Sequence, residues 1–284
     1  MSLMKISFYI PTRNSQETIE KCLESVLSQS LKPHEIFIIE GSSKDSTISI
    51  IKKIAKKKLS IPINIITQKS IGLANARNLA ISNANFEIIA SCDSDVVLGK
   101  EWLKNIIKPL YDSKIVGVGG HMSEKISSKY DKWRPIHMKQ NWGNKKIKNP
   151  RFLFGSNTVF KKIVFKKIKY NPNLTSNFED VDISIKIKNK GYTIFYEPKA
   201  KCTHIKSDTF KSLLKTYYNW TFYGYPKPNN LLNLALKLFI FNVSKSTKLI
   251  IKDIFNLRFG FILLDIAIYF HNSLKDVQFF MKNG

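Results

Sequence analysis

The sequence predicts an α/β fold: a mostly parallel central β-sheet flanked by helices, followed by an α-helical appendage. Short runs rich in β-branched residues alternate with amphipathic helical patterns through the first 120 residues. This alternation is typical of parallel sheets whose crossover connections are helices. Residues 152–205 return to mixed strands and helices, and apolar residues then recur at helical spacing in two stretches, 231–241 and 259–270.

The first part of the chain is expected to supply four strands of the sheet. Apolar runs predict four strands, at residues 6–10, 35–40, 63–67 and 87–92. Helices are expected after residue 15, from about 45 to 58, and after Gly72. The first of these helices has an apolar stripe at helical spacing that is suited to packing on the sheet. The stripe consists of Ile19, Cys22, Leu23, Val26 and Leu27.

Composition indicates a folded protein of a reducing compartment. Hydrophobic residues make up 43% of the 284 residues and aromatic residues 12%, which excludes a disordered chain. The three cysteines are odd in number and far apart in sequence, so we expect reduced, mostly buried thiols rather than a disulfide framework. The first twenty residues do not have the basic-then-apolar pattern of a signal peptide. We therefore expect a cytoplasmic protein.

The net charge of +25 is concentrated outside the first third of the chain. Residues 101–284 carry 33 basic and 12 acidic side chains. Such a field attracts polyanions, among them nucleic acids, anionic lipid headgroups and phosphorylated substrates. A general lysine bias in composition explains the excess equally well.

Two regions are expected to cover a site or to contact a membrane. Residues 121–150 are polar, basic and aromatic with little periodicity, so we expect a long loop over a site. The apolar stretches 231–241 and 259–270 are too short and interrupted to span a bilayer. With the lysines between them they are expected to lie on an anionic membrane surface, or to cap the sheet domain or form a dimer contact. The aromatic residues in 217–225 fit sugar stacking, a membrane interface or core packing.

The triplet Asp93-Ser94-Asp95 follows an apolar strand. Ligands of open α/β sheets bind at the carboxyl ends of strands, so the triplet is expected at the rim of a crevice. Two carboxylates at this spacing suit one hard cation such as Mg²⁺ or Mn²⁺, which in turn binds a diphosphate. The same triplet also occurs in ordinary turns and helix caps.

The triplet is one of seven short segments that follow one another in a fixed order. They are residues 10–14 (Ile-Pro-Thr-Arg-Asn), 39–47, 72–78, 93–95, 155–157, 179–182 and 190–192, with His204 following them. The series resembles the family 2 glycosyltransferases, which have the glycosyltransferase A fold. The resemblance implies a catalytic domain over residues 4–225 and a helical appendage over residues 231–284. It also implies a nucleotide-sugar donor, a divalent cation (Mn²⁺ or Mg²⁺) and inversion at the anomeric carbon.

The resemblance also implies the donor-binding residues. Pro11, Thr12 and Arg13 would line the nucleoside pocket, although the family more often has an aromatic residue at the position of Arg13. Glu40 would bind the base, where the family usually has Asp; its alternative role is to cap the turn after a strand. Arg77 would clamp the donor phosphates together with Asp93, or else form an ordinary surface ion pair.

The metal ligands implied by the resemblance are Asp93, Asp95 and His204. Imidazole suits Mn²⁺ better than Mg²⁺, which prefers oxygen ligands. A single His near a strand is otherwise often a packed or surface residue.

An inverting transfer is a single displacement and needs one base, and by the resemblance that base is Asp180. Glu179 and Asp182 flank Asp180, and their charges raise its pKa; with Gly155 they are expected beside the base, on the acceptor side or behind it. These acids also suit the N-terminus of a helix. Residues 181–187 alternate like a strand, but the resemblance favours a helix.

The expected partners are a UDP- or GDP-sugar, a glycan or polyisoprenyl-linked acceptor, and an anionic membrane surface at the inner face of the cell membrane. We expect no nucleic acid as a partner. Two alternatives remain open. A sugar-nucleotide nucleotidyltransferase would have a glycine-rich loop where residues 11–14 contain no glycine. A basic nucleic-acid-binding protein would explain the charge, but no recognised nucleic-acid module is visible.

Overall fold

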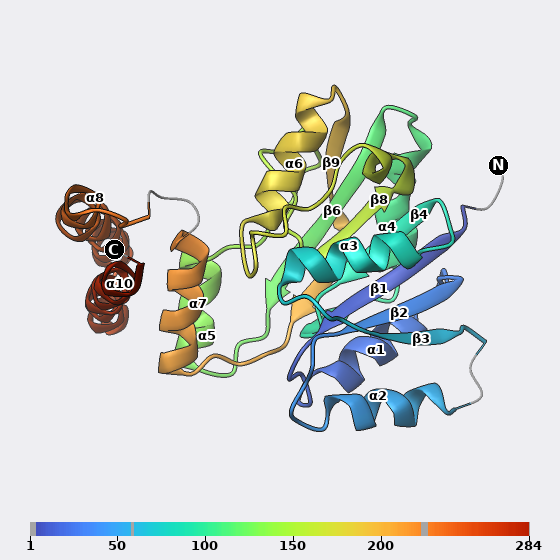
Figure 1. Cartoon of the computed structure of the whole chain (residues 1–284), viewed down its shortest axis with the longest axis horizontal. Coiled ribbons are helices and arrows are strands. Elements are labelled where there is room, and N and C mark those ends of the chain that lie inside the picture. The colour runs from blue at the N-terminus through green and yellow to red at the C-terminus, as the bar shows by residue number, and fades with distance from the viewer. Residues whose placement is uncertain (1–3, 58–59, 223–226, 284) are drawn as a thin grey trace. The chain divides into compact units, whose positions relative to one another are not determined.

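The computed structural model describes residues 4–57, 60–222 and 227–283, which form two compact units (Figure 1). The sheet unit comprises residues 1–125 and 140–206, and the helical unit residues 126–139 and 207–284. The boundary therefore differs from the expected one between residues 225 and 231. Residues 126–139 and 207–222 belong with the C-terminal helices because their apolar faces pack within the same core.

Over the described residues the sheet has nine strands in the order β3-β2-β1-β4-β8-β6-β9-β5, and β7 pairs with β9. Their bounds are β1 Ile6–Thr12, β2 Glu35–Glu40, β3 Ile63–Thr67, β4 Ile88–Cys92, β5 Val96–Leu98, β6 Ile115–Glu124, β7 Ile147–Lys148, β8 Asn157–Lys161 and β9 Thr193–His204. The four strands expected from the first apolar runs are confirmed.

The sheet is parallel in its first half and mixed in its second. Neighbours in the run β3-β2-β1-β4 are parallel, as predicted. Beyond it, β8 is antiparallel to both β4 and β6, and β5 is antiparallel to β9. β6 and β9 are again parallel, so the expected parallel pairs occur in both halves, with antiparallel pairs added in the second. Strand direction depends on where each connection re-enters the sheet, and local apolar patterns do not encode that.

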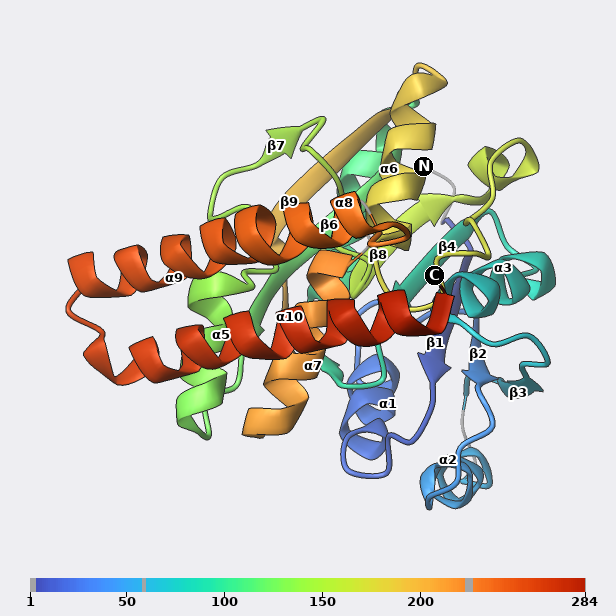
Figure 2. The ribbon, with the colours of Figure 1, turned by 60° about the vertical axis from the view of Figure 1, so that its left-hand side comes forward.

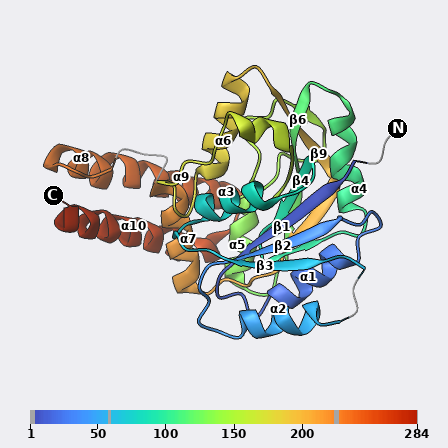
Figure 3. The same ribbon diagram turned by 45° about the vertical axis from the view of Figure 1, so that its right-hand side comes forward.

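Helices cover both faces of the sheet (Figures 1 and 3). One face packs against α1 Ile19–Leu27, α2 Thr47–Ala55 and α4 Trp102–Ile107. The other packs against α3 Leu73–Asn83 and α6 Glu179–Asn189. Alternate residues of β1 point to opposite faces, with Phe8 in the first core and Tyr9 in the second.

The apolar stripe of α1 is buried in the first core, as the sequence predicts. All three cysteines are free and buried among the described residues. Residues 179–189 form a helix despite their strand-like alternation, because Ile183 and Ile187 lie at helical spacing on the buried face.

Residues 121–150 are not one long loop. β6 continues to Glu124, α5 spans Lys129–His137, and β7 follows. Ser128 accepts a hydrogen bond from the Asp131 N–H and so caps α5. Trp133 of α5 is fully buried in the helical unit. Part of the segment expected to be a loop is therefore a short helix with one deeply buried ring.

The helical unit contains α5 and the C-terminal helices (Figure 2). The latter are α7 Phe210–Phe222, α8 Leu231–Leu236, the π-helical segment η3 Lys237–Asn242, α9 Val243–Phe255 and α10 Ile262–Asn283. In Figure 2, α9 and α10 lie side by side as an antiparallel pair. Among the described residues, no helix has both the length and the apolar character needed to cross a bilayer.

The described aromatic residues of 217–225 are buried or partly buried. Tyr217 of α7 is buried in the core of the helical unit, where its ring contacts Trp133 edge-on. Tyr218 donates a hydrogen bond to the buried Asp276 at 3.1 Å. Core packing therefore accounts for part of this cluster. Tyr223 and Tyr225 lie outside the described residues.

Candidate functional site

The candidate site lies at the carboxyl end of β4, as the sequence predicts. Asp93 directly follows the strand, and its backbone N–H donates to the carbonyl of Ser156 at 3.1 Å. This bond joins the triplet to the segment that leads into β8. The side chains of Asp93 and Asp95 are 31% and 29% exposed, so both remain open to a ligand.

Arg77 is a buried charge at the centre of the site. Its side chain is 1% exposed, and its guanidinium lies 3.4 Å from the carboxylates of both Asp93 and Glu179. It also donates to the hydroxyl of Tyr9 at 3.4 Å and lies 5.8 Å from the ring centre of Tyr170. Arg77 is therefore not in a surface ion pair: it holds two carboxylates and two aromatic rings together.

The acidic side chains around Arg77 are crowded enough to disturb one another's ionisation. Burial raises the pKa of Asp93; Arg77 opposes the rise, and the charges of Asp95 and Asp180 reinforce it. Burial likewise raises the pKa of Glu179 to about 8, against the opposing effect of Arg77. The cluster thus carries more acid than its single guanidinium balances, and such sites favour an added cation.

Asp180 lies at the N-terminus of α6, where the helix dipole favours a carboxylate. One oxygen accepts the Gly155 N–H at 3.0 Å, and the other accepts the Val181 N–H at 2.8 Å. Each oxygen keeps a second lone pair, so the carboxylate can still accept a proton. Burial raises the pKa of Asp180 in spite of these two hydrogen bonds.

Gly155 allows these groups to approach one another. A Cβ atom at this position would lie 2.8 Å from an Arg77 nitrogen and 3.2 Å from the Asp180 Cβ. At these distances a larger residue must shift the Arg77 guanidinium or Asp180, and both are held by contacts within the site.

Asp95, His204 and Glu124 form a chain across the sheet. His204 Nε2 lies 3.4 Å from an Asp95 oxygen, and Nδ1 lies 2.6 Å from a Glu124 oxygen. Glu124 and His204 are aligned partners on β6 and β9, which sets this contact. When Nδ1–H donates to Glu124, the Nε2 lone pair faces the Asp95 carboxylate. Two acceptors facing each other in this way fit a shared cation.

A small polar cavity of about 220 Å³ opens beside Asp95. It lies next to the carboxyl end of β1, and its lining residues are Asn14, Ser15, Gln16, Glu17, Thr18, Asp45, Asp95 and Lys206. Of the expected metal ligands, Asp95 thus borders a space lined by hydroxyl, amide and charged groups.

The expected nucleoside residues lie at the carboxyl ends of β1 and β2. Pro11 and Thr12 are buried, and the Thr12 hydroxyl has no hydrogen-bond partner among the described residues. Arg13 is exposed. The Glu40 carboxylate accepts the N–H groups of Ser42 and Ser43 at 3.0 and 2.5 Å, so it caps the turn that follows β2.

The structure therefore unites most of the residues expected from the sequence. Arg77 lies against Asp93 and Glu179. The charges of Asp95 and Asp180 act on Asp93, and His204 contacts Asp95. Asp182 instead forms an ion pair with Lys186, one turn further along α6, at 2.7 Å.

Sequence reasoning missed three members of the site: Tyr9, Tyr170 and Glu124. A polar residue at the end of the apolar run 115–122 was a usable signal for Glu124. Its pairing with His204 depends on the register of two strands about 80 residues apart. Neither Tyr9 nor Tyr170 has a local signal, because each reaches Arg77 only through the fold.

A second carboxylate and imidazole cluster lies in the helical unit. Of the described residues, one set of three His, Cys, Asp or Glu has its ligand atoms within 4.8 Å of one another: His137, Asp253 and Asp265. Trp133 donates to Asp265 at 2.8 Å, and Arg258 lies 3.5 Å from Asp253. These partners tie α5, α9 and α10 together, and the cluster is separate from the expected set Asp93, Asp95 and His204.

Comparisons with known proteins agree with the geometry of the sheet unit. The sequence profile of glycosyl transferase family 2 matches residues 7–169. The poly-beta-1,6-N-acetyl-D-glucosamine synthase of Staphylococcus aureus (strain COL) is 30% identical over 225 residues, which cover 76% of this chain and 53% of that protein. The corresponding synthase of Staphylococcus epidermidis is 29% identical over the same length. This chain spans about half the length of these curated relatives.

Solved structures share the fold. The mannosyltransferase PcManGT from Pyrobaculum calidifontis, in complex with GDP-Man and Mn²⁺, has a TM-score of 0.66 at 16% identity, covering 96% of this chain and 87% of its own. S. aureus TarS 1-349, in complex with UDP-GlcNAc, has a TM-score of 0.55 at 19% identity, covering 76% and 64%. With its profile match over more than half its length, the chain belongs to glycosyl transferase family 2 and has the glycosyltransferase A fold.

Proposed function

We propose that this chain is an inverting glycosyltransferase that moves one sugar from a nucleotide-diphosphate donor to an acceptor hydroxyl. The observation that carries the proposal is the position of Asp180. Its carboxylate is held by two backbone N–H groups beside Arg77 and Asp93, at the carboxyl ends of the strands. The family match does not favour the nucleotidyltransferase or the nucleic-acid-binding alternative.

The proposed reaction is a single displacement. The acceptor oxygen forms a bond to the anomeric carbon as the bond from that carbon to the nucleotide diphosphate breaks. Asp180 takes the proton of the attacking hydroxyl on a free lone pair. Its raised pKa suits this role, because a general base works best when its pKa approaches the working pH.

Asp93, Asp95 and His204 are the residues we propose to hold Mn²⁺ or Mg²⁺. Support comes from the excess of acid over base in the cluster and from the Nε2 lone pair of His204 facing Asp95. A bound divalent cation would neutralise charge on the diphosphate leaving group. Glu124 is proposed to fix the imidazole tautomer, a role that carboxylates commonly have behind metal-bound histidines.

On the donor side, Pro11, Thr12 and Arg13 are proposed to meet the nucleoside, and the unpartnered Thr12 hydroxyl offers a hydrogen bond there. Glu40 is proposed to shape this pocket chiefly through the turn that it caps. Arg77 would act on the donor phosphates indirectly, by holding Asp93 in place. We propose that Glu179, next to the base Asp180, is the second carboxylate whose charge Arg77 balances.

The substrate class follows from the relatives. Solved structures with the same fold are complexes with UDP-GlcNAc or GDP-Man, and the curated relatives are polysaccharide synthases. We propose a UDP- or GDP-sugar donor and a glycan or polyisoprenyl-linked acceptor. Peripheral attachment to the cytoplasmic face of the membrane is proposed from the exposed apolar side chains of the helical unit and the excess of basic residues.

The test compares Asp180→Asn with Asp182→Asn, a matched change on the same helix. The amide keeps the size of the side chain but cannot accept the acceptor's proton. Asp180→Asn is expected to lower turnover by about 10²–10⁴-fold with little change in donor affinity, whereas Asp182→Asn is expected to keep turnover near the wild-type value. Turnover is followed by release of UDP or GDP, and donor affinity by calorimetry with Mn²⁺.

Unchanged turnover in Asp180→Asn would overturn the assignment of the base. Equal loss of turnover and donor affinity would make Asp180 a structural residue instead. A first screen of UDP and GDP by thermal shift in Mn²⁺ identifies the nucleotide, because a ligand that binds only the folded state raises its stability.

A further inference from the structure

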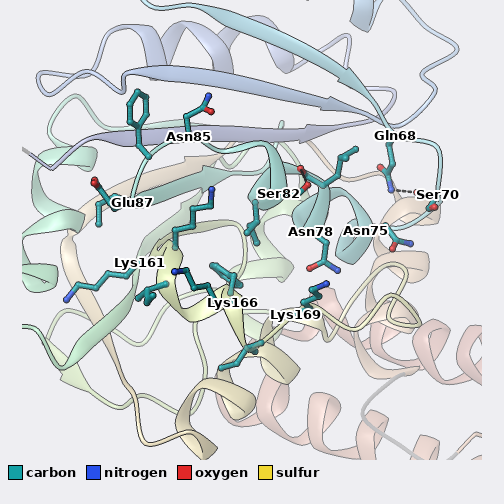
Figure 4. A pocket seen from close by; sticks show the side chains of 18 of the residues that line it. Gln68, Ser70, Asn75, Asn78, Ser82, Asn85, Glu87, Lys161, Lys166 and Lys169 are labelled. Carbon is teal, nitrogen blue, oxygen red and sulfur yellow. Dashed lines mark hydrogen bonds between the residues drawn. The ribbon is translucent and has the colours of Figure 1, made fainter.

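A second cavity of the sheet unit lies away from the acidic cluster. A groove of about 1060 Å³ runs along the outer side of α3. Figure 4 shows Asn75, Asn78 and Ser82 of α3 on its wall, with Lys166 and Lys169 on the segment opposite. Arg77 lies on the buried face of the same helix, so the groove and the proposed active site use different sides of α3.

The floor and walls of this groove are apolar. Buried or partly buried side chains from α3, β4, the chain around β1 and the segment after β8 line it: Met4, Leu79, Ile81, Phe86, Ile88, Phe165 and Ile168. Ile163 also lines the groove and is 53% exposed. Covering such a surface with an aliphatic chain would remove apolar area from water, which is favourable.

The rim of the groove is basic. Five lysines line it, Lys69, Lys161, Lys162, Lys166 and Lys169, against a single acidic side chain, Glu87. Lys161 and Lys162 are anchored, because their ammonium groups donate to backbone carbonyls. Within the described part of the chain, no acidic side chain pairs with Lys69, Lys166 or Lys169. These three ammonium groups are available to an anion.

We propose that this groove binds one amphiphilic phosphate: a lipid whose aliphatic chain lies along the apolar wall and whose phosphate meets Lys166 and Lys169. The combination of an apolar wall and a basic rim favours this ligand over simpler ones. Inorganic phosphate would leave the wall uncovered, and a neutral amphiphile would leave the unpaired lysines without a counter-charge. Asn75 and Ser82 add polar groups to this wall, whereas the Asn78 amide is hydrogen-bonded to the backbone of Tyr170. The site is separate from the proposed transfer chemistry and does not depend on it.

The test measures calorimetric binding to the full chain of three probes, each below its critical micelle concentration where it has one. Dodecyl phosphate carries both features, inorganic phosphate only the head, and dodecyl maltoside only the chain. Dodecyl phosphate is expected to bind at least about tenfold more tightly than either of the others, because it alone contacts both the lysines and the apolar wall.

Two variants locate the site. Lys166→Glu/Lys169→Glu reverses the unpaired charges, and Ser82→Trp fills the groove from an exposed position. Each is expected to weaken dodecyl phosphate binding by about tenfold or more. The matched control Lys53→Glu/Lys56→Glu makes the same charge change on exposed positions of and beside α2 and is expected to leave binding within about twofold.

Three outcomes would overturn the proposal: phosphate alone or maltoside binding as tightly as dodecyl phosphate, both groove variants binding normally, or the control losing binding equally. Melting temperatures near the wild-type value show that the variants fold. Binding of UDP or GDP with Mn²⁺ is expected to persist in all of them, so failure here is distinguishable from failure of the proposed transferase function.

Discussion

Glu124 and His204 face each other across the paired strands β6 and β9, with 2.6 Å between a carboxylate oxygen and the imidazole Nδ1. Both side chains are almost fully buried. The contact fixes which ring nitrogen is directed at Asp95, so a residue outside the seven segments of the family resemblance controls the orientation of a proposed metal ligand.

Glu124→Ala is therefore expected to weaken Mn²⁺ binding by about 10–100-fold, the usual cost of losing the carboxylate behind a metal-bound histidine. Electron paramagnetic resonance titration of Mn²⁺ into the free protein measures this without reference to activity. Ser123→Ala, on the neighbouring exposed position of β6, serves as the control and is expected to bind Mn²⁺ normally. Equal Mn²⁺ affinity in Glu124→Ala and the wild type would remove Glu124 from the metal site.

Arg77→Met is expected to destabilise the sheet unit by about 3–5 kcal/mol, because Glu179 and Asp93 would lose the buried charge that balances them. Urea denaturation followed by tryptophan fluorescence measures the free energy of unfolding. Arg13→Met removes the same group from an exposed position and is expected to change stability by less than about 0.5 kcal/mol. Similar effects of the two substitutions would contradict the role of Arg77 as the internal counter-charge.

Gly155→Ala is expected to lower turnover by about 10²-fold, because the new methyl group must displace either the Arg77 guanidinium or Asp180. Gly260→Ala is the control, since a Cβ there meets nothing within 4 Å. Turnover is measured by release of the nucleotide diphosphate. Retention of wild-type turnover in Gly155→Ala would show that the close packing around Asp180 is dispensable.

Asp265 makes the helical unit sensitive to pH. Its pKa is raised to about 7 by burial, against the Trp133 hydrogen bond that lowers it, and the charge of Asp253 raises it further. The folded state therefore retains a proton that the unfolded state releases near pH 4. The stabilisation from this proton is complete below about pH 4 and is lost as the pH rises through 7. His137 acts in the opposite sense, because burial lowers its pKa.

Asp265→Asn isolates the effect of Asp265, since the amide does not titrate. Between about pH 4 and 7 the free energy of unfolding of this variant, relative to that of the wild type, is expected to rise by up to about 1.4 kcal/mol per pH unit. Hydrogen exchange of α5, α9 and α10 across this range reports the change. A constant difference between the two proteins would mean that Asp265 is ionised throughout.

The helical unit exposes apolar side chains near the turn between α9 and α10, with Phe255 82%, Leu257 77% and Leu263 81% exposed. Phe255→Ser/Leu257→Ser is expected to reduce co-sedimentation with anionic liposomes several-fold, since apolar burial and lysine attraction act together. Ile71→Ser, at an equally exposed position of the sheet unit, is the control. Wild-type binding is expected to weaken with salt; equal binding to neutral liposomes would point to a different attachment.

The sequence by itself determined the fold class and the first four strands, and it placed Asp93 and Asp95 after a strand. These features have local causes: apolar periodicity, and carboxylates placed where a strand ends. The helix that begins at Glu179, Asp180 within it, His204 and Arg77 were inferred from their places in an ordered series of motifs.

Tertiary structure decided how those residues work. The burial of Arg77 between two carboxylates, the pairing of Glu124 with His204, the mixed direction of the later strands and the membership of α5 in the helical unit all depend on contacts between distant segments. A local window contains neither strand register nor the face on which a side chain is buried. Those are set only when the sheet closes around its core, because one residue of slip in register moves every side chain of a strand to the other face.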